Sequence, residues 1–306
     1  MRVMVGSRAS RLAKAQVREV LAGWRQRLPG VEFVEKEILE DGDLDRRTPT
    51  IGEVARTTGT SAFSSRQEAA LTAGEVDVVV HSLKDLPTAM PAGLVLLRPP
   101  GPRQDVRDAL CGRSLAELPP GARVGTGAPR RIGQLLALRP DLQVVPVRGN
   151  VPTRLDVLRQ TGRVDAVILA VAGLARLGLT GHIAQVWDEE IFLPSPGQGA
   201  LGIQVRAGST VAAILAGTGD AGVDAAVRAE RTLLAGLHGG CSVPVGAWAR
   251  PSGQGLLRLS AAVTSPDGTE QHRVEVEGDA QRPEELGRVA AEDLLAMGAG
   301  KLLTAE

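Results

Sequence analysis

Short runs of β-branched residues alternate with longer helical patterns through the first two thirds of this sequence, and this alternation constrains the fold more than any other feature. Four of the five residues in Val76–Val80 are valine, and Ala166–Leu169 is apolar throughout, as in strands covered on both faces. Ser10–Leu28 and Pro129–Leu138 carry apolar residues at helical spacing. Strands and helices in alternation predict an α/β fold with largely parallel sheets. Further strands are predicted at Val3–Val5, Val31–Ile38, Leu94–Leu97, Arg123–Gly125 and Gln143–Val147, and further helices at Phe63–Ala73 and Pro152–Gln160.

Two stretches rich in proline and glycine, Arg98–Arg103 and Leu193–Gly202, resemble crossings between domains. After about residue 215 the pattern changes to a helix, three strands and a last helix, which predicts an α+β unit. These elements are predicted at Val223–Leu237, Val243–Ala249, Leu256–Val263, His272–Glu277 and Pro283–Met297. We therefore expect three domains: residues 1–97 with 195–214, residues 98–194, and residues 215–306.

Composition excludes several classes of protein. Lys+Arg and Asp+Glu are 35 each, so a nucleic-acid binder driven by bulk charge is not expected. The two cysteines, Cys111 and Cys241, cannot form a disulfide scaffold and make no pair or quartet at metal-ligand spacing, and no metal is expected. There is no signal-type apolar segment and no apolar run of about 18 residues, so we expect a cytoplasmic protein without a membrane span.

Arginines are concentrated in the stretch Gly121–Val164, which holds eight arginines and two aspartates in a chain of zero net charge. Several of them stand where a predicted strand passes into a predicted helix, and open α/β sheets bind ligands at that edge. Guanidinium groups near helix N-termini suit carboxylate or phosphate, and no phosphate-binding glycine motif is present, so a ligand with several carboxylates fits best. The alternative is a solvated basic face.

The segment HSLKDLP, His81–Pro87, follows a predicted buried strand, so its side chains should lie at the edge of a sheet. Lys84 is one of four lysines, and Asp85 beside it could act as a general acid or base or stabilise a cation. A capped turn with a surface ion pair is the alternative, and His81 by itself fits a structural histidine better than a catalyst.

The segment HGGCSVP, His238–Pro244, places Cys241 after two glycines between a helix and a strand. An accessible thiol near arginines would be nucleophilic, whereas a buried cysteine would be inert. Cys111, in DALCGRS, is expected to be a small core residue. Gln198, in PSPGQGAL, fits either a hinge or a polar contact in a cleft.

These residues leave three functions open. One is a carboxylate-binding sensor, which would explain the arginines but not the cysteine loop. A second is a cysteine-dependent transferase that uses some other carboxylated substrate. The third comes from a resemblance that covers nearly the whole chain.

Taken in order, the motifs closely resemble the hydroxymethylbilane synthase family, also called the porphobilinogen deaminase family. The motifs are GSRASRLAKAQ (Gly6–Gln16), HSLKDLPT from His81, RGNVPTRLDVL (Arg148–Leu158), AVAGLARLGL (Ala170–Leu179), PSPGQGAL (Pro194–Leu201) and AERTLLAGLHGGCSVPVG (Ala229–Gly246). The resemblance implies two lobes like those of periplasmic binding proteins flanking a cleft, plus a smaller C-terminal α+β domain. It implies head-to-tail condensation of four porphobilinogen molecules, with release of ammonia, to give hydroxymethylbilane.

The resemblance also implies residue roles. A dipyrromethane cofactor is expected in thioether linkage to Cys241, and Asp85 is expected to be the catalytic acid. The residues expected to bind the cofactor are Ser82, Lys84, Asp85, Thr126, Arg130 and Arg131. Those expected to bind substrate are Arg8, Ser10, Arg148, Arg154, Arg176 and Gln198. The expected partners are porphobilinogen and the growing polypyrrole chain, bound by a monomer.

Two segments depart from the family pattern. The family's Gly-Gly-Lys-Gly-Leu-Phe is TGTSAF here, which places Thr60 where the lysine is expected. The family's Gly-Thr-Ser-Ser-Leu-Arg-Arg is GTGAPRR, so Gly127 and Ala128 replace two hydroxyl residues. We expect weaker or rearranged cofactor contacts at these positions, without loss of activity.

Overall fold

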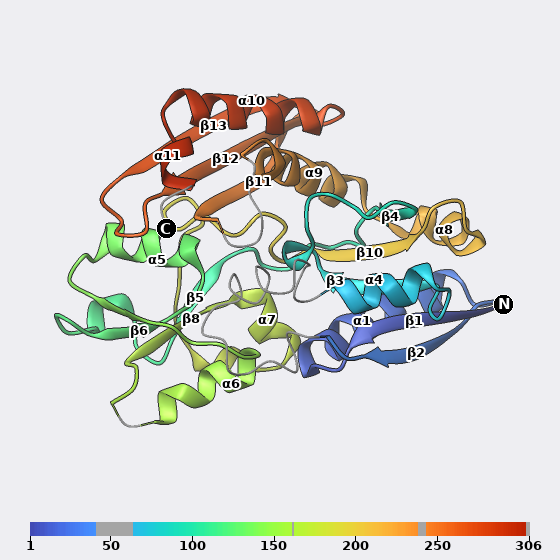
Figure 1. Cartoon of the computed structure of the whole chain (residues 1–306), viewed down its shortest axis with the longest axis horizontal. Helices are drawn as coiled ribbons and strands as arrows, with labels where there is room; N and C mark the ends of the chain where they lie inside the picture. Colours follow the sequence, from blue (N-terminus) through green and yellow to red (C-terminus); the bar gives the residue numbers. More distant parts are fainter. Residues whose placement is uncertain (41–63, 161, 238–242, 304–306) are drawn as a thin grey trace. The chain divides into compact units, whose positions relative to one another are not determined.

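The computed structural model describes residues 1–40, 64–160, 162–237 and 243–303 (Figure 1). By its internal contacts the chain forms two compact units. The first unit joins Met1–Gln104 to Gly199–Asp224, and the second unit joins Asp105–Gln198 to Ala225–Glu306. Five 3₁₀ turns connect the longer elements of the described chain: Leu83–Asp85 (η1), Leu115–Glu117 (η2), Val157–Arg159 (η3), Thr180–His182 (η4) and Ala216–Thr218 (η5).

The first unit is built on a five-stranded sheet of order β2-β1-β3-β10-β4. Its strands are β1 (Arg2–Arg8), β2 (Glu32–Ile38), β3 (Val78–Ser82), β4 (Leu94–Leu97) and β10 (Leu201–Arg206). β1 pairs in parallel with β2 and β3, whereas β10 is antiparallel to β3 and to β4. The apolar character of β3 is explained by this central position.

Helices cover the two faces of this sheet with different residues. Because side chains alternate along a strand, Val78 and Val80 pack on one face with α1 (Arg11–Arg27) and α8 (Thr210–Leu215). Val79 packs on the other face with α4 (Ser65–Thr72). The same alternation places His81 on the α4 face, which matters for the site below.

The second unit contains a sheet of the same plan, with order β7-β6-β8-β5-β9. Its strands are β5 (Asp108–Cys111), β6 (Arg123–Gly125), β7 (Gln143–Val145), β8 (Ala166–Ala170) and β9 (Ile183–Val186). β6 pairs in parallel with β7 and β8, and β5 is antiparallel to β8 and β9. α5 (Pro129–Leu138) packs on one face through Leu135, while α6 (Val151–Asp156) and α7 (Val171–Arg176) pack on the other.

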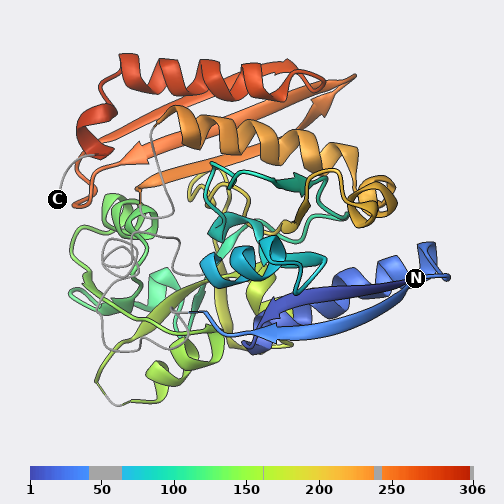
Figure 2. The same cartoon turned by 45° about the vertical axis from the view of Figure 1, so that its right-hand side comes forward.

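A three-stranded antiparallel sheet follows, formed by β11 (Val245–Gly253), β12 (Leu256–Thr264) and β13 (Gln271–Asp279). α9 (Ala221–Gly236), α10 (Pro283–Ala296) and the short α11 (Gly300–Leu303) share one apolar core with these strands (Figure 2). α9 and α10 approach closely at Gly287, where a Cβ atom would lie 2.4 Å from the carbonyl oxygen of Ala229. This position therefore excludes any larger residue.

The predicted fold class, α/β with a smaller C-terminal α+β unit, is confirmed. The sheets are largely parallel, but each holds one antiparallel strand that the sequence analysis did not include. The predicted strand at Val76–Val80 begins two residues later and runs through His81 and Ser82. The predicted helix at Pro152–Gln160 changes to a 3₁₀ turn at Val157. The division into three domains stays a prediction.

No single described helix is both long enough and apolar enough to cross a membrane. One bent pair, Thr210–Thr218 with Ala221–Gly236, passes by length and composition when its two parts are taken together.

Candidate functional site

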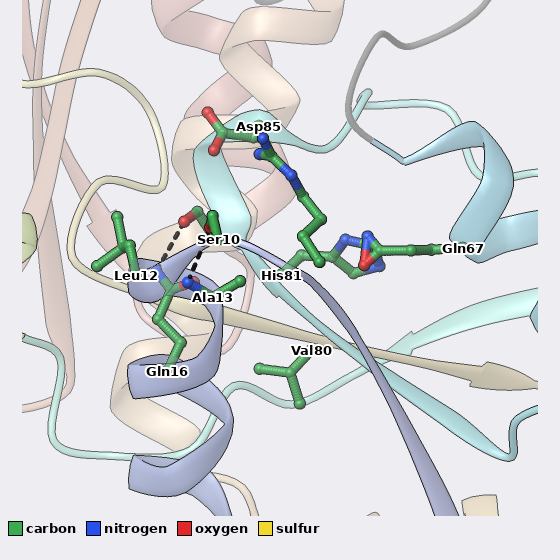
Figure 3. A pocket seen from close by; sticks show the side chains of 10 residues that line it. Ser10, Leu12, Ala13, Gln16, Gln67, Val80, His81 and Asp85 are labelled. Atoms are coloured by element: carbon green, nitrogen blue, oxygen red, sulfur yellow. Dashed lines mark hydrogen bonds between the residues drawn. The ribbon is translucent and has the colours of Figure 1, made fainter. Parts of the chain in front are cut away.

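A pocket lies in the first unit where β1 and β3 end (Figure 3). Both strands run in the same direction, so their carboxyl ends reach one edge of the sheet, the usual place for a ligand in an open α/β fold. Arg8 closes β1, His81 and Ser82 close β3, and Asp85 stands in the η1 turn that follows. Ser10, Gln16 and Gln67 line the same pocket.

Local structure fixes the first turn of α1 against this pocket. Ser10 is the N-cap residue, with extended backbone, and its Oγ accepts a hydrogen bond of 3.2 Å from the Ala13 amide. One turn later the buried Gln16 donates from Nε2 to the Ser82 Oγ at 2.7 Å. The helix start and the end of β3 are therefore held together by a side-chain hydrogen bond.

Two buried leucines, Leu83 and Leu86, anchor the η1 turn. Leu83 and Leu86 are fully buried, and the Leu83 amide donates to the carbonyl of Ala200 at 3.1 Å. A Cβ atom at Gly202 would lie 2.9 Å from Leu86 and 3.3 Å from Leu83, so the glycine in β10 makes room for both. Lys84 and Asp85, between the two leucines, remain partly exposed, and Asp85 faces the pocket.

A buried charge cluster lies in the second unit, centred on Asp108 at the start of β5. Arg130 Nη2 donates to Oδ2 and Arg131 Nη2 donates to Oδ1, both at 2.7 Å. The Gln198 side chain donates to Oδ1 at 3.0 Å and to the carbonyl of Val106 at 2.7 Å. Pro129 occupies the first turn of α5, where its missing N–H costs nothing, and the two arginines that follow it are buried.

Among the described residues, the Asp108 cluster joins two guanidinium groups to one carboxylate. Burial lowers the pKa of Arg130, an effect that Asp108 opposes and Arg131 reinforces. Nε of Arg131 is buried and has no hydrogen-bond partner in the described part of the chain. Buried polar groups are normally paired, so this orphaned donor suits an anionic ligand.

The other predicted residues of the second unit lie at strand and helix ends. Arg148 follows β7, and its buried Nη1 has no partner among residues that the structure describes. Arg154, in α6, donates from Nε to the Gly149 carbonyl at 2.9 Å. Thr126 is buried directly after β6, and Arg176 is the last residue of α7. Cys241 and Thr60 lie outside the described residues.

The departure at Gly127 and Ala128 has a visible consequence. Ala128 is the N-cap residue of α5 and gives that helix no side-chain hydrogen bond. A Cβ atom at Gly127 would lie 3.6 Å from the Val147 carbonyl, an ordinary contact, so the space for a side chain remains. The first turn of α5 thus keeps its shape without the hydroxyl groups of the family pattern.

Sequence reasoning missed three polar residues of these two groups: Gln16 and Gln67 in the pocket and Asp108 in the charge cluster. Asp108 was detectable, because an acid at the head of a fully buried strand requires a cationic partner. Cys111, in the same strand, is a core residue as expected, and burial raises the pKa of its thiol to about 11. No group of three or more potential metal ligands occurs within the described ranges.

Fold and site together define a class of α/β protein that has two sheets of the same topology. The strand ends of the first sheet present an acid to a pocket, and the second unit holds two buried arginines paired with one aspartate. Residues 3–213 match the family model described as porphobilinogen deaminase, dipyromethane cofactor binding domain. Residues 225–296 match the one described as porphobilinogen deaminase, C-terminal domain. The chain belongs to the porphobilinogen deaminase family, as predicted.

Curated relatives named porphobilinogen deaminase are similar over almost their full length. The relative from Desulforudis audaxviator is 48% identical, covering 98% of this chain and 96% of its own. Those from Acidothermus cellulolyticus and Thermus thermophilus are 45% and 43% identical over 98% of this chain, and over 91% and 98% of their own. Among solved structures, the methionine-binding protein MetQ gives a TM-score of 0.43 at 15% identity, covering 71% of this chain and 89% of that one. A likeness at that level adds no argument.

Family membership confirms the predicted enzyme class, a transferase of tetrapyrrole biosynthesis that carries a dipyrromethane cofactor. The structure fits that cofactor, because the buried Nε of Arg131, unpartnered within the described residues, suits a carboxylate.

Proposed function

We propose that this chain joins four porphobilinogen molecules head to tail, with loss of ammonia, and releases hydroxymethylbilane. The observation that carries the proposal is the pocket at the ends of β1 and β3, which gathers one acid, Asp85, with the cation Arg8 and the hydroxyl of Ser10. A pyrrole with carboxylate substituents and an ammonium leaving group needs these groups.

Asp85 is the proposed catalytic residue. Departure of ammonia leaves positive charge on the reacting pyrrole, and a fixed carboxylate stabilises that charge where it develops. The same carboxylate can take up the proton lost when the new carbon–carbon bond forms. The buried leucines on both sides of the η1 turn hold Asp85 in place for both roles.

The dipyrromethane cofactor, joined by a thioether to Cys241, supplies the pyrrole on which the chain is extended. Ser82, Lys84, Asp85, Thr126, Arg130 and Arg131 are the proposed residues that hold it. The buried Nε of Arg131, which lacks a hydrogen-bond partner among the described residues, supports this role for the arginines, because a carboxylate of the cofactor could accept from it.

Arg8, Ser10, Arg148, Arg154, Arg176 and Gln198 are the proposed substrate-binding residues. The buried, unpartnered Nη1 of Arg148 supports an anion site at that position. Gln198 donates to Asp108, so its proposed contribution includes holding that carboxylate beneath the arginines.

The proposed organisation is three domains, comprising residues 1–97 with 195–214, residues 98–194 and residues 215–306, in a cytoplasmic monomer. The growing polypyrrole is the proposed partner, without nucleic acid or membrane, in keeping with zero net charge. Light scattering behind a sizing column tests the monomer at 31.9 kDa.

Intact mass tests the covalent step. The purified protein should exceed its polypeptide mass by one dipyrromethane, and Cys241→Ser should carry no such addition. Cys111→Ser is the matched control and should keep the adduct. A carboxylate-binding sensor would show no adduct in any variant and no hydroxymethylbilane, and that result would overturn the proposal.

A further inference from the structure

The backbone of Leu193, in the second unit, is fully buried beside Arg130, and the proposed mechanism gives it no part. Its carbonyl oxygen accepts from Arg130 Nη1 at 2.6 Å and from Gln134 Nε2 at 3.0 Å. Its amide donates to Gln134 Oε1 at 2.7 Å. The Gln134 side chain, 3% exposed, therefore binds both polar groups of one residue, as a neighbouring antiparallel strand would do.

The place of Gln134 in α5 explains why its amide reaches the same carbonyl as Arg130. The two residues are four positions apart, so their side chains lie on one side of the helix in successive turns. Since the Leu193 amide needs an acceptor and the Leu193 carbonyl needs a donor, the orientation of the Gln134 amide is fixed. A glutamine supplies both groups without carrying charge.

Arg130 depends on the Leu193 carbonyl for one of its acceptors. Its Nη1 donates to that carbonyl and its Nη2 donates to Asp108 Oδ2, so two separate segments hold the two ends of one guanidinium group. The other oxygen of Asp108 accepts from Arg131 Nη2 at 2.7 Å. A buried guanidinium that loses an acceptor must move or keep an unsatisfied N–H, and the shared carboxylate would pass such a movement on to Arg131.

The next peptide is bound by the third sheet. The Ala247 amide, on β11, donates to the Pro194 carbonyl at 2.9 Å. β11 is the strand that follows Cys241 in the sequence. Leu193 and Pro194 therefore connect Arg130 with the strand that follows the proposed attachment point of the cofactor, and a shift of Leu193 would disturb both.

We propose that Gln134 is a positioning residue, which holds the Leu193 carbonyl in place as an acceptor for Arg130 and so keeps Arg130 and Arg131 ready for a carboxylate of the cofactor. The inference rests on the function proposed above. Because Gln134 and Leu193 are neutral, they order a guanidinium group without adding a second carboxylate that would compete with the ligand. Gln134 acts through Arg130 and is not a catalytic residue.

Gln134→Met tests this role, because methionine suits a helix and fills a similar space but has no amide for the Leu193 backbone. For the adduct-bearing protein we expect kcat/KM for porphobilinogen to fall about tenfold, the scale of one hydrogen bond to a charged group. Gln185→Met is the matched control, since Gln185 Oε1 accepts from the Leu115 amide at 2.8 Å in the same unit. The midpoint of urea unfolding should fall in both variants, and kcat/KM should fall only in Gln134→Met.

A double-mutant cycle separates positioning from a general loss of stability. If Gln134 acts through Arg130, Gln134→Met should lower the kcat/KM of an Arg130→Met protein by less than about twofold. Losses that multiply in the double variant would overturn the inference. So would an unchanged kcat/KM in a folded, adduct-bearing Gln134→Met protein.

If these variants do not fold, hydrogen exchange in the unsubstituted protein decides. The Leu193 amide should exchange only when the whole unit unfolds, because its acceptor is a buried side chain. Exchange as fast as that of an exposed loop would refute the proposal. Slow exchange in a protein that makes no hydroxymethylbilane would instead refute the proposed function alone.

Discussion

The sheets β2-β1-β3-β10-β4 and β7-β6-β8-β5-β9 repeat one plan, in which four strands run in one direction and the fourth strand in the order runs antiparallel to them. Their strand ends carry opposite chemistry. In the first sheet an acid in a short turn faces an open pocket, with a cation and two hydroxyls around it. In the second sheet two arginines are buried against one carboxylate, and a third arginine keeps an unpartnered, buried nitrogen within the described residues.

The difference shows that the fold supplies the location and the local residues supply the chemistry. Asp85 can act on a substrate because Leu83 and Leu86, not the acid, anchor its turn. Arg130 and Arg131 are held by Asp108 before any ligand arrives, so their positions are prepared in advance. We therefore expect substitutions in the first sheet to affect turnover and those in the second to affect stability and anion binding.

Asp85→Asn should produce the largest effect. Loss of the carboxylate should reduce turnover by about 10²- to 10⁴-fold, because both charge stabilisation and proton uptake depend on it. The dipyrromethane adduct should remain, as measured by intact mass. Glu32→Gln, an exposed acid of the same unit, should behave as the parent. If the turnover of Asp85→Asn lies within threefold of the parent's, Asp85 is not the catalytic residue.

Asp108→Ala should be the most destabilising change in the second unit. It leaves two buried guanidinium groups without their carboxylate, and breaking a buried pair costs about 3–5 kcal/mol. The free energy of unfolding in urea measures this cost. A loss below about 1 kcal/mol would show that the arginines do not need Asp108, and the contrast between the sheets would fail.

Arg148→Ala should separate binding from stability. Nη1 of Arg148 has no hydrogen-bond partner among the described residues, so its removal breaks no interaction at that atom. We therefore expect the free energy of unfolding to change by about 0.5 kcal/mol or less. The kcat/KM for porphobilinogen should fall about tenfold or more, as expected for a charged hydrogen bond. Arg159→Ala, whose side chain is 76% exposed, is the control. Equal kinetics for both variants would contradict the anion site.

Asp141→Asn should have the smallest effect. Asp141 pairs with Arg139 at 2.7 Å, the same distance as in the buried cluster, and this hydrogen bond lowers its pKa to about 2. The stabilisation is fully present at neutral pH and is lost as the pH falls from the ordinary carboxyl pKa of 3.8 through about 2. Because the pair is exposed to solvent, we expect no measurable change in urea unfolding at pH 7. A loss as large as that of Asp108→Ala would show that burial is not the cause of the contrast.

Helices and strands were predicted well where the capping residue and the apolar repeat that define them lie in one segment of the sequence. α1 was predicted as Ser10–Leu28 and runs over Arg11–Arg27, with those two predicted ends as its caps, because a capping serine and an amphipathic repeat define it. The positions of Asp85, Arg130 and Arg131 at strand and helix ends followed from the same signals.

Pairing between distant segments could not be predicted in this way. β10 runs antiparallel to its neighbours β3 and β4, and β5 runs antiparallel to its neighbours β8 and β9. Nothing within the sequence of either strand specifies its direction. Gln198 reaches Asp108 across 90 positions, and Gln204 reaches Glu68 across 136. A local pattern shows that a polar residue stands in an apolar strand, but its partner depends on the topology.

The antiparallel β10 has a consequence for the order in which the chain acquires its structure during synthesis. β4, at one edge of the sheet, pairs with β10 alone among the described strands, and β10 begins at Leu201, more than 100 residues later. The sheet of residues 108–186 needs no such late strand. A nascent chain that has emerged only to Gln198 therefore has all the strands of the second sheet and lacks one of the first, so the middle of the polypeptide can mature before its beginning.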